Sequence, residues 1–163
     1  MGKIIRLSVF LAVISALSGL CLSFVNSKTA PIIAENSASK ETAYLEEMFP
    51  NATFTESEED GEFVKKSYEC SDGVAYQIVV SGYGGDISFL LGIDNDGQYV
   101  GYVVLDASGE TSGIGTQIQE EDFTNSVLEA TVDDEVDTIS GATISSSAVV
   151  EGINEAAELY SER

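Results

Sequence analysis

The chain has 163 residues, 28 acidic against 7 basic, and it contains no histidine and no tryptophan. This length suits one domain of ordinary size. The lack of histidine excludes a Ser-His-Asp triad, a His-ligated zinc site and an imidazole pH switch. The formal charge of −21 argues against a nucleic-acid partner, whose phosphates would be repelled. We therefore expect chemistry from a bound group, or from hydroxyls, carboxylates and backbone.

The N-terminal part of the sequence is typical of a membrane anchor. Lys3 and Arg6 precede an uncharged apolar run, Leu7–Val25, and every acidic residue lies further along. At about 1.5 Å per residue, this run nearly matches a hydrocarbon core of roughly 30 Å. Basic residues before the run and an acidic body after it predict a cytoplasmic N-terminus and an extracytoplasmic body. A cleaved signal peptide is the alternative, but the run exceeds the usual apolar region of such peptides.

Beyond the anchor, the sequence predicts helices on either side of a β-rich middle. Helix-forming residues run from Pro31 to Met48, and Phe49-Pro50-Asn51 ends that helix. The acidic stretch Glu56–Glu62 is predicted to be a solvated loop. Strands are predicted at Phe63–Glu69, Val74–Ser81, Ile87–Ile93 and Gln98–Asp106, with a hairpin turn at Asp94–Gly97, and helices at Glu120–Ala130 and Ser145–Ser161. Strands and helices without βαβ alternation predict an α+β domain built on antiparallel sheet.

These elements divide the sequence into three parts. Residues 1–27 are predicted to be a cytoplasmic tip and transmembrane anchor, 28–50 a linker helix, and 51–163 an extracytoplasmic domain. Cys21 falls in the anchor and Cys70 in the domain. We expect both to be free thiols, with a disulfide between them as the alternative.

Two glycine-rich segments interrupt the β-rich middle. Ser81–Gly85 lies between two predicted strands, and its glycine content alone predicts a tight turn. Ser108–Thr116 is too long for a minimal hairpin. Its backbone N–H groups could approach a flat or anionic ligand closely. A plain surface loop is the alternative for this second segment.

A hydroxyl-rich segment, Asp137–Ser147, leads into the last predicted helix. Its simplest interpretation is a strand end, a glycine turn and a helix whose N-cap is Ser145 or Ser146. One cap does not account for five hydroxyl residues between Ser140 and Ser147. A helix N-terminus presents free N–H groups and the positive end of the helix dipole, which suit a phosphate. No G-x-x-x-x-G-K-[ST] motif is present, which excludes a P-loop.

Part of this segment, Asp137-Thr138-Ile139-Ser140-Gly141-Ala142-Thr143, resembles the flavinylation motif of the FMN-binding domain family. Gly82–Ile87 and Glu110–Gly115 resemble two further segments of the same family, in the same order. The second departs from the family at Ser112, where proline is usual, so this loop is expected to be less rigid.

The front of the chain extends the resemblance. The single anchor followed by Val25–Glu35, and a helix ending in Phe49–Ala52, are similar to the G subunits of Rnf-type electron transport complexes. The resemblance therefore covers nearly the whole chain, with weaker support between Thr53 and Ala75. It implies an N-terminal transmembrane helix followed by an antiparallel-sheet FMN-binding domain, 51–163, with flanking helices.

The function that this resemblance implies is that of a membrane-anchored electron carrier. It would be an electron-transfer subunit of a ferredoxin:NAD oxidoreductase that moves Na⁺ or H⁺, without turnover of its own. The partners implied are the other membrane subunits and the flavin transferase that installs FMN from FAD. Two alternatives are related flavoproteins: the C subunit of Na⁺-pumping NADH:quinone reductase, and a stand-alone membrane-tethered carrier. The alternative from another class is an anchored acidic binding or scaffold module without flavin.

The resemblance also implies roles for individual residues. Thr143 would carry FMN through a phosphoester bond, with Asp137 recognised during modification. The amides of Ile144 to Ser146 would lie near the phosphodiester, and the Glu110–Gly115 loop would lie against the isoalloxazine ring. The cofactor-binding residues expected are Thr143, Asp137, Ser140, Gly141, Ala142, Ile144, Ser145, Glu110, Thr111, Gly113, Ile114, Gly115, Gly84 and Gly85. No catalytic residue or metal ligand is expected, because the chemistry would belong to the flavin.

Overall fold

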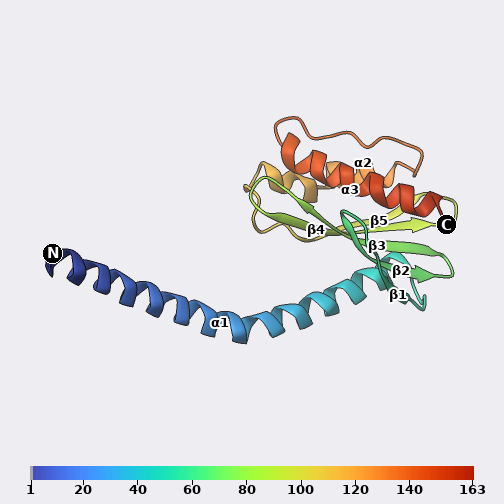
Figure 1. Cartoon of the computed structure of the whole chain (residues 1–163). Helices are drawn as coiled ribbons and strands as arrows, with labels where there is room; N and C mark the ends of the chain where they lie inside the picture. The colour runs from blue at the N-terminus through green and yellow to red at the C-terminus, as the bar shows by residue number, and fades with distance from the viewer. Residues whose placement is uncertain (1) are drawn as a thin grey trace. The chain divides into compact units, whose positions relative to one another are not determined.

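A computed structural model describes residues 2–163, apart from the side chains of residues 31–36. The chain divides into two compact units, one ending at Ser39 and the other comprising Lys40–Arg163. Helix α1 (Gly2–Met48) begins in the first unit and ends in the second (Figure 1). Its segment Gly2–Ala30 is long and apolar enough to cross a membrane, and its side chains are exposed. This segment fits a single-pass membrane anchor.

The second unit is built on an antiparallel sheet. Among the described residues it has five strands in the order β1-β2-β3-β4-β5, so that sequential strands are neighbours. The strands are β1 (Thr55–Glu58), β2 (Val64–Cys70), β3 (Gly73–Ser81), β4 (Asp86–Asp94) and β5 (Tyr99–Asp106). They are followed by the 3₁₀-helix η1 (Gly115–Gln119), α2 (Glu121–Leu128) and α3 (Thr143–Ser161). The predicted α+β fold with flanking helices is confirmed.

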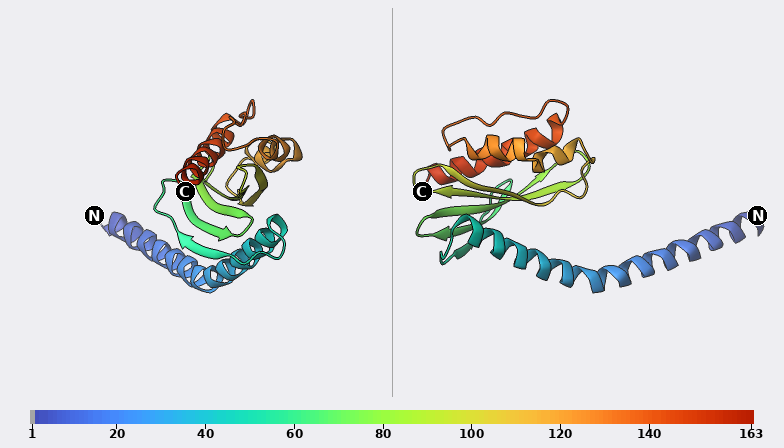
Figure 2. Two further views of the ribbon diagram at one scale, coloured as in Figure 1. Left: turned by 90° about the vertical axis from the view of Figure 1, so that its right-hand side faces the viewer. Right: turned by 180° about the vertical axis from the view of Figure 1, so that it is seen from behind.

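Helices α2 and α3 cover one face of the sheet (Figures 1 and 2). Alternate side chains of each strand point to this face, because strand side chains alternate with a period of two. These side chains and those of the helices form the main hydrophobic core. Its fully buried residues include Ile78 of β3, Phe89 of β4 and Ile153 of α3. Tyr102 of β5 packs against Phe89, and its hydroxyl donates to the Ile118 carbonyl at 3.1 Å. Burial raises the pKa of Tyr102 well above its usual range, so the phenol remains a neutral donor.

The last turns of α1, within the second unit, cover part of the opposite face. The buried members of this smaller core are Leu45, Phe49, Tyr68, Ala75 and Leu90. Gly92 of β4 and Gly101 of β5 are register partners on this face. A Cβ at Gly101 would lie 2.3 Å from Cγ of Met48, so glycine is needed for the helix end to approach the sheet.

The predicted strands, and the predicted helices that correspond to α2 and α3, agree with the observed ones to within two residues. The predicted helix Pro31–Met48 is the last part of the continuous helix α1, and η1 was not predicted. The strand end predicted in the segment before Gly141 is wrong, because residues 137–140 form no strand.

The prediction of a loop over Glu56–Glu62 is wrong at its start, because Thr55–Glu58 forms an edge strand paired with β2. All four side chains of β1 are exposed, so its sequence has no apolar alternation. Helix α1 ends at Met48 as predicted, and Cys21 and Cys70 are free.

The Glu155 carboxylate of α3 forms hydrogen bonds with the backbone segment that leads into β2. Glu155 accepts backbone N–H bonds from Glu62 and Phe63, each at 2.6 Å, and from Val64 at 3.2 Å. A Cβ at Gly61 would lie 2.5 Å from the same carboxylate, so the chain passes it closely. Hydrogen bonds to a charged group contribute about 1.5–3 kcal/mol each, more than neutral ones.

We expect Glu155→Ala to lower the free energy of unfolding by about 2–3 kcal/mol, because three backbone amides lose their acceptor and two of these hydrogen bonds are partly buried. The measurement is urea unfolding of the full chain in detergent, followed by tyrosine fluorescence. Glu151→Ala is the matched control on an exposed position of the same helix and should change stability by less than about 0.5 kcal/mol. Equal losses in the two variants would contradict the role of Glu155.

Candidate functional site

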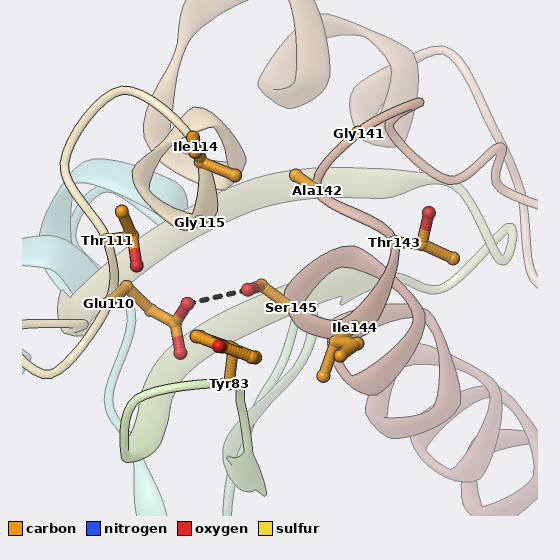
Figure 3. Close-up of a pocket in the computed structure, with 10 residues that line it drawn as sticks. All are labelled: Tyr83, Glu110, Thr111, Ile114, Gly115, Gly141, Ala142, Thr143, Ile144 and Ser145. Carbon is orange, nitrogen blue, oxygen red and sulfur yellow. Dashed lines mark hydrogen bonds between the residues drawn. The ribbon is translucent and has the colours of Figure 1, made fainter.

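A pocket of about 530 Å³ opens beside the first turn of α3 (Figure 3). Three segments form it: the turn between β3 and β4, the loop after β5, and the start of α3. The lining residues are Tyr83, Glu110, Thr111, Ile114, Gly115, Gly141, Ala142, Thr143, Ile144 and Ser145. This volume lies in the range of about 300–1,000 Å³ that is usual for small-molecule sites.

Thr143 is the first residue of α3, and its side chain is exposed. The preceding N-cap position is occupied by Ala142, which makes no side-chain capping bond. The amides of the first helical turn have no intrahelical acceptor, and here no side chain at the cap supplies one. An exposed hydroxyl therefore stands at a helix N-terminus that is open to an anion.

The prediction that Ser145 or Ser146 caps the helix is wrong. The helix begins two residues before Ser145, and both serines are buried with partners elsewhere. The Ser146 hydroxyl donates to the Ala142 carbonyl at 3.0 Å and accepts the Ile139 N–H at 3.0 Å. Gly141, with φ of +92°, makes the turn between these two partners. Ser146 thus holds the residues before Thr143 against the helix.

The amides of Ile144 to Ser146 were expected to lie near a phosphate, and this expectation is wrong for Ser146. The Ser146 backbone N–H donates to the Ala142 carbonyl at 3.0 Å, as the first hydrogen bond of the helix. Only the amides of Ile144 and Ser145 remain from the expected set, together with that of Thr143 itself.

One charged side chain, Glu110, lines the pocket, and it is 8% exposed. Its carboxylate accepts a hydrogen bond from the Ser145 hydroxyl at 2.6 Å and one from the Gly84 N–H at 3.1 Å. Figure 3 shows Glu110 and Ser145 pointing toward each other, with Thr143 on the other side of the helix start. The charge therefore lies away from the exposed threonine.

Three exposed apolar side chains lie around the pocket. Tyr83, Ile114 and Ile144 are 69%, 49% and 57% exposed. In the part of the second unit that the structure describes, the other large hydrophobic side chain with comparable exposure is Val100, at 38%. Apolar groups gathered at one opening suit a flat, partly apolar ligand.

The structure brings together most of the residues that the sequence assigns to the site. Those that line the pocket are Glu110, Thr111, Ile114, Gly115, Gly141, Ala142, Thr143, Ile144 and Ser145. Gly84, Gly85 and Gly113 lie in the surrounding turn and loop without lining it. Asp137 and Ser140 are not among the lining residues, and Asp137 lines a separate hollow with residues of η1 and α2. Tyr83 was missed, although its place between two glycines of the β3–β4 turn was a usable signal.

Comparison with known proteins agrees with this arrangement. Residues 82–158 match the family model of the FMN-binding domain, and this range includes every residue that lines the pocket. The G subunit of the Na⁺-translocating ferredoxin:NAD⁺ oxidoreductase complex of Acetobacterium woodii is 28% identical over 190 aligned positions, which cover 96% of this chain and 91% of that protein. The G subunit of the ion-translocating oxidoreductase complex of Methanosarcina acetivorans is 30% identical over 180 positions, covering 98% and 95%. The chain therefore belongs to the family of G subunits of ion-translocating oxidoreductase complexes and contains an FMN-binding domain.

Proposed function

We propose that this chain carries electrons on an FMN joined covalently, through a phosphoester bond, to Thr143. The family and the FMN-binding domain support the electron-carrier role and the cofactor. The single observation that carries the attachment point is the exposed Thr143 hydroxyl at the uncapped start of α3, beside the pocket. FMN supplies the electron transfer when bound, and the protein supplies position and electrostatics.

The residues around Thr143 fit a phosphate. The open amides of the first turn are hydrogen-bond donors, and the helix dipole places partial positive charge at the same point. Ser146 and Gly141 hold the preceding turn in shape without occupying the Thr143 hydroxyl. Asp137 is exposed on that segment, which suits recognition by a flavin transferase during maturation.

The pocket fits the ring system of a flavin. Its volume suits a small ligand, and Tyr83, Ile114 and Ile144 offer apolar and aromatic surface at the opening. The loop of Glu110 to Gly115 would lie against the isoalloxazine ring. With its phosphate at Thr143, the cofactor would extend toward this loop and leave one edge accessible for electron exchange.

The setting we propose is a membrane complex that couples electron flow between ferredoxin and NAD to the movement of Na⁺ or H⁺. The segment Gly2–Ala30 would anchor the chain beside the other membrane subunits. Lys3 and Arg6 favour a cytoplasmic N-terminus, which puts the acidic second unit outside. A covalent link would keep an anionic cofactor on so acidic a protein.

We expect Thr143→Ala to abolish covalent flavin attachment. The full chain, co-expressed with a flavin transferase and purified in detergent, should gain the mass of FMN minus water and keep its yellow colour after denaturation. Thr143→Ala removes the only acceptor proposed, so it should gain neither. Thr138→Ala, which changes an exposed threonine in the same segment, is the matched control and should remain modified.

A wild-type chain that stays colourless, while the same transferase modifies a known acceptor, would overturn the proposal. It would favour the anchored acidic binding module instead. Modification that persists in Thr143→Ala would keep the flavin and move the attachment point to another hydroxyl.

We expect the second unit to face outward in the cell. Alkaline phosphatase folds into its active form only outside the cytoplasm, so a fusion after Arg163 should be active in intact bacterial cells. A fluorescent protein that folds only in the cytoplasm is the matched control at the same position, and it should stay dark. The reverse pattern would contradict the orientation inferred from Lys3 and Arg6.

A further inference from the structure

Glu110 forms hydrogen bonds with two other segments of the pocket. Its two carboxylate oxygens face different segments, one the Gly84 N–H and the other the Ser145 hydroxyl. Its own backbone N–H donates to the Ala107 carbonyl at 3.0 Å, which closes the loop after β5. A single buried side chain thereby contacts the β3–β4 turn and the start of α3 from the loop between them.

Glycines surround this carboxylate where a side chain would collide with it. A Cβ at Gly82 would lie 2.2 Å from one oxygen of Glu110, and a Cβ at Gly115 would lie 2.0 Å from the other. A side chain at either position would therefore displace the Glu110 carboxylate from its observed place. The two glycine-rich segments thus meet around Glu110.

A third glycine contact joins the same two segments directly. A Cβ at Gly84 would lie 1.9 Å from the Gly109 carbonyl oxygen, so the β3–β4 turn rests on the loop backbone to backbone. This approach brings the Gly84 N–H within reach of the Glu110 carboxylate. These contacts are within the protein. Packing against the Glu110 carboxylate explains the glycines at 82 and 115, and packing against the Gly109 backbone explains the glycine at 84, without any ligand.

We infer that Glu110 is the positioning residue of the FMN site. It acts through Ser145 and the Gly84 amide, and it sets the distance between the three segments that form the pocket. The inference rests on the proposed function, because it assigns the pocket to FMN. Glu110 is also the one charged side chain that lines the pocket.

Two substitutions distinguish the effect of the Glu110 hydrogen bonds from the effect of its charge. Glu110→Ala removes both bonds and the charge. Glu110→Gln removes only the charge, because an amide oxygen accepts the Gly84 N–H while the amide nitrogen donates to the Ser145 hydroxyl, which can rotate to accept. Glu151→Gln removes one exposed charge from the same helix α3 and is the matched control.

The first measurement needs no cofactor. In the full chain expressed without a flavin transferase, hydrogen–deuterium exchange is followed in peptides that cover residues 82–85 and 146–149. Glu110→Ala should speed exchange there by about tenfold, the factor for about 1.4 kcal/mol of local stability. Glu110→Gln and Glu151→Gln should exchange as the wild type does. Unchanged exchange in Glu110→Ala would overturn the positioning role.

The second measurement uses the same variants loaded with FMN by a flavin transferase. The initial rate of FMN incorporation, read by intact mass, should fall about tenfold in Glu110→Ala and be restored in Glu110→Gln. The midpoint potential of the loaded Glu110→Gln protein should be more positive than that of wild type, because a nearby negative charge opposes the gain of electrons. Glu151→Gln should leave the potential unchanged, because water screens its exposed charge.

Two results would overturn the inference here: incorporation into Glu110→Ala at the wild-type rate, or a Glu110→Gln potential equal to that of wild type. A wild-type chain that takes up no FMN would instead overturn the proposed function. In that case the exchange measurement still decides whether Glu110 positions the three segments.

Discussion

The shape of the pocket depends on the two hydrogen bonds of the Glu110 carboxylate. Strand pairing ends at Ser81 with Asp86 and at Ser88 with Asp106, so the β-ladder does not extend into the turn and loop that form the pocket. Beyond those pairs, the segments are held by side chains and close backbone contacts. A buried carboxylate with a donor at each oxygen suits this task, because a buried acceptor that loses its donor is costly. The requirement for close approach then dictates glycine at the neighbouring positions.

The start of α3 is fixed because the rest of α3 belongs to the main core. Val149 and Ile153 are fully buried against the sheet, and Glu155 holds the backbone that enters β2. Thr143 is therefore attached to a rigid element although its own side chain is exposed. Under the proposed function this matters, since a cofactor attached at Thr143 would keep a constant distance from the groups that exchange electrons with it.

Local sequence patterns predicted the fold well where burial governs structure. The apolar runs of β3 and β4 and the breaker at Phe49-Pro50-Asn51 are local signals, and they located their elements to within two residues. Strand β1 escaped prediction because its side chains are all exposed, and backbone pairing with β2 has no signature in exposed side chains. The helix cap was misassigned because Ser145 and Ser146 bond to groups that are distant or that precede the helix, and spacing does not reveal such contacts.

For the candidate site, too, local sequence predicted one part and long-range contacts determine the other. The residues of the site were identified from motifs that resemble a family, while the arrangement of these residues depends on long-range contacts. The bond between Glu110 and Ser145 joins residues 35 positions apart, and Tyr83 contributes to the opening from a third segment. The glycines of Ser108–Thr116 were expected to let the backbone approach a ligand. The structure shows that Gly115 lies close to the Glu110 carboxylate of the protein itself, which spacing did not reveal.

Two charged features, the N-terminus of α3 and the Glu110 carboxylate, give the pocket a positive side and a negative side. The uncapped N-terminus of α3 places partial positive charge beside Thr143, and the Glu110 carboxylate places negative charge on the other side of the helix start. An anionic phosphate is stabilised at the first position and repelled from the second. Under the proposed function, attachment at Thr143 therefore agrees with the field of the protein itself. The proposed covalent bond would fix an orientation that the charges already favour, with the phosphate at the helix and the ring toward Tyr83, Ile114 and Ile144.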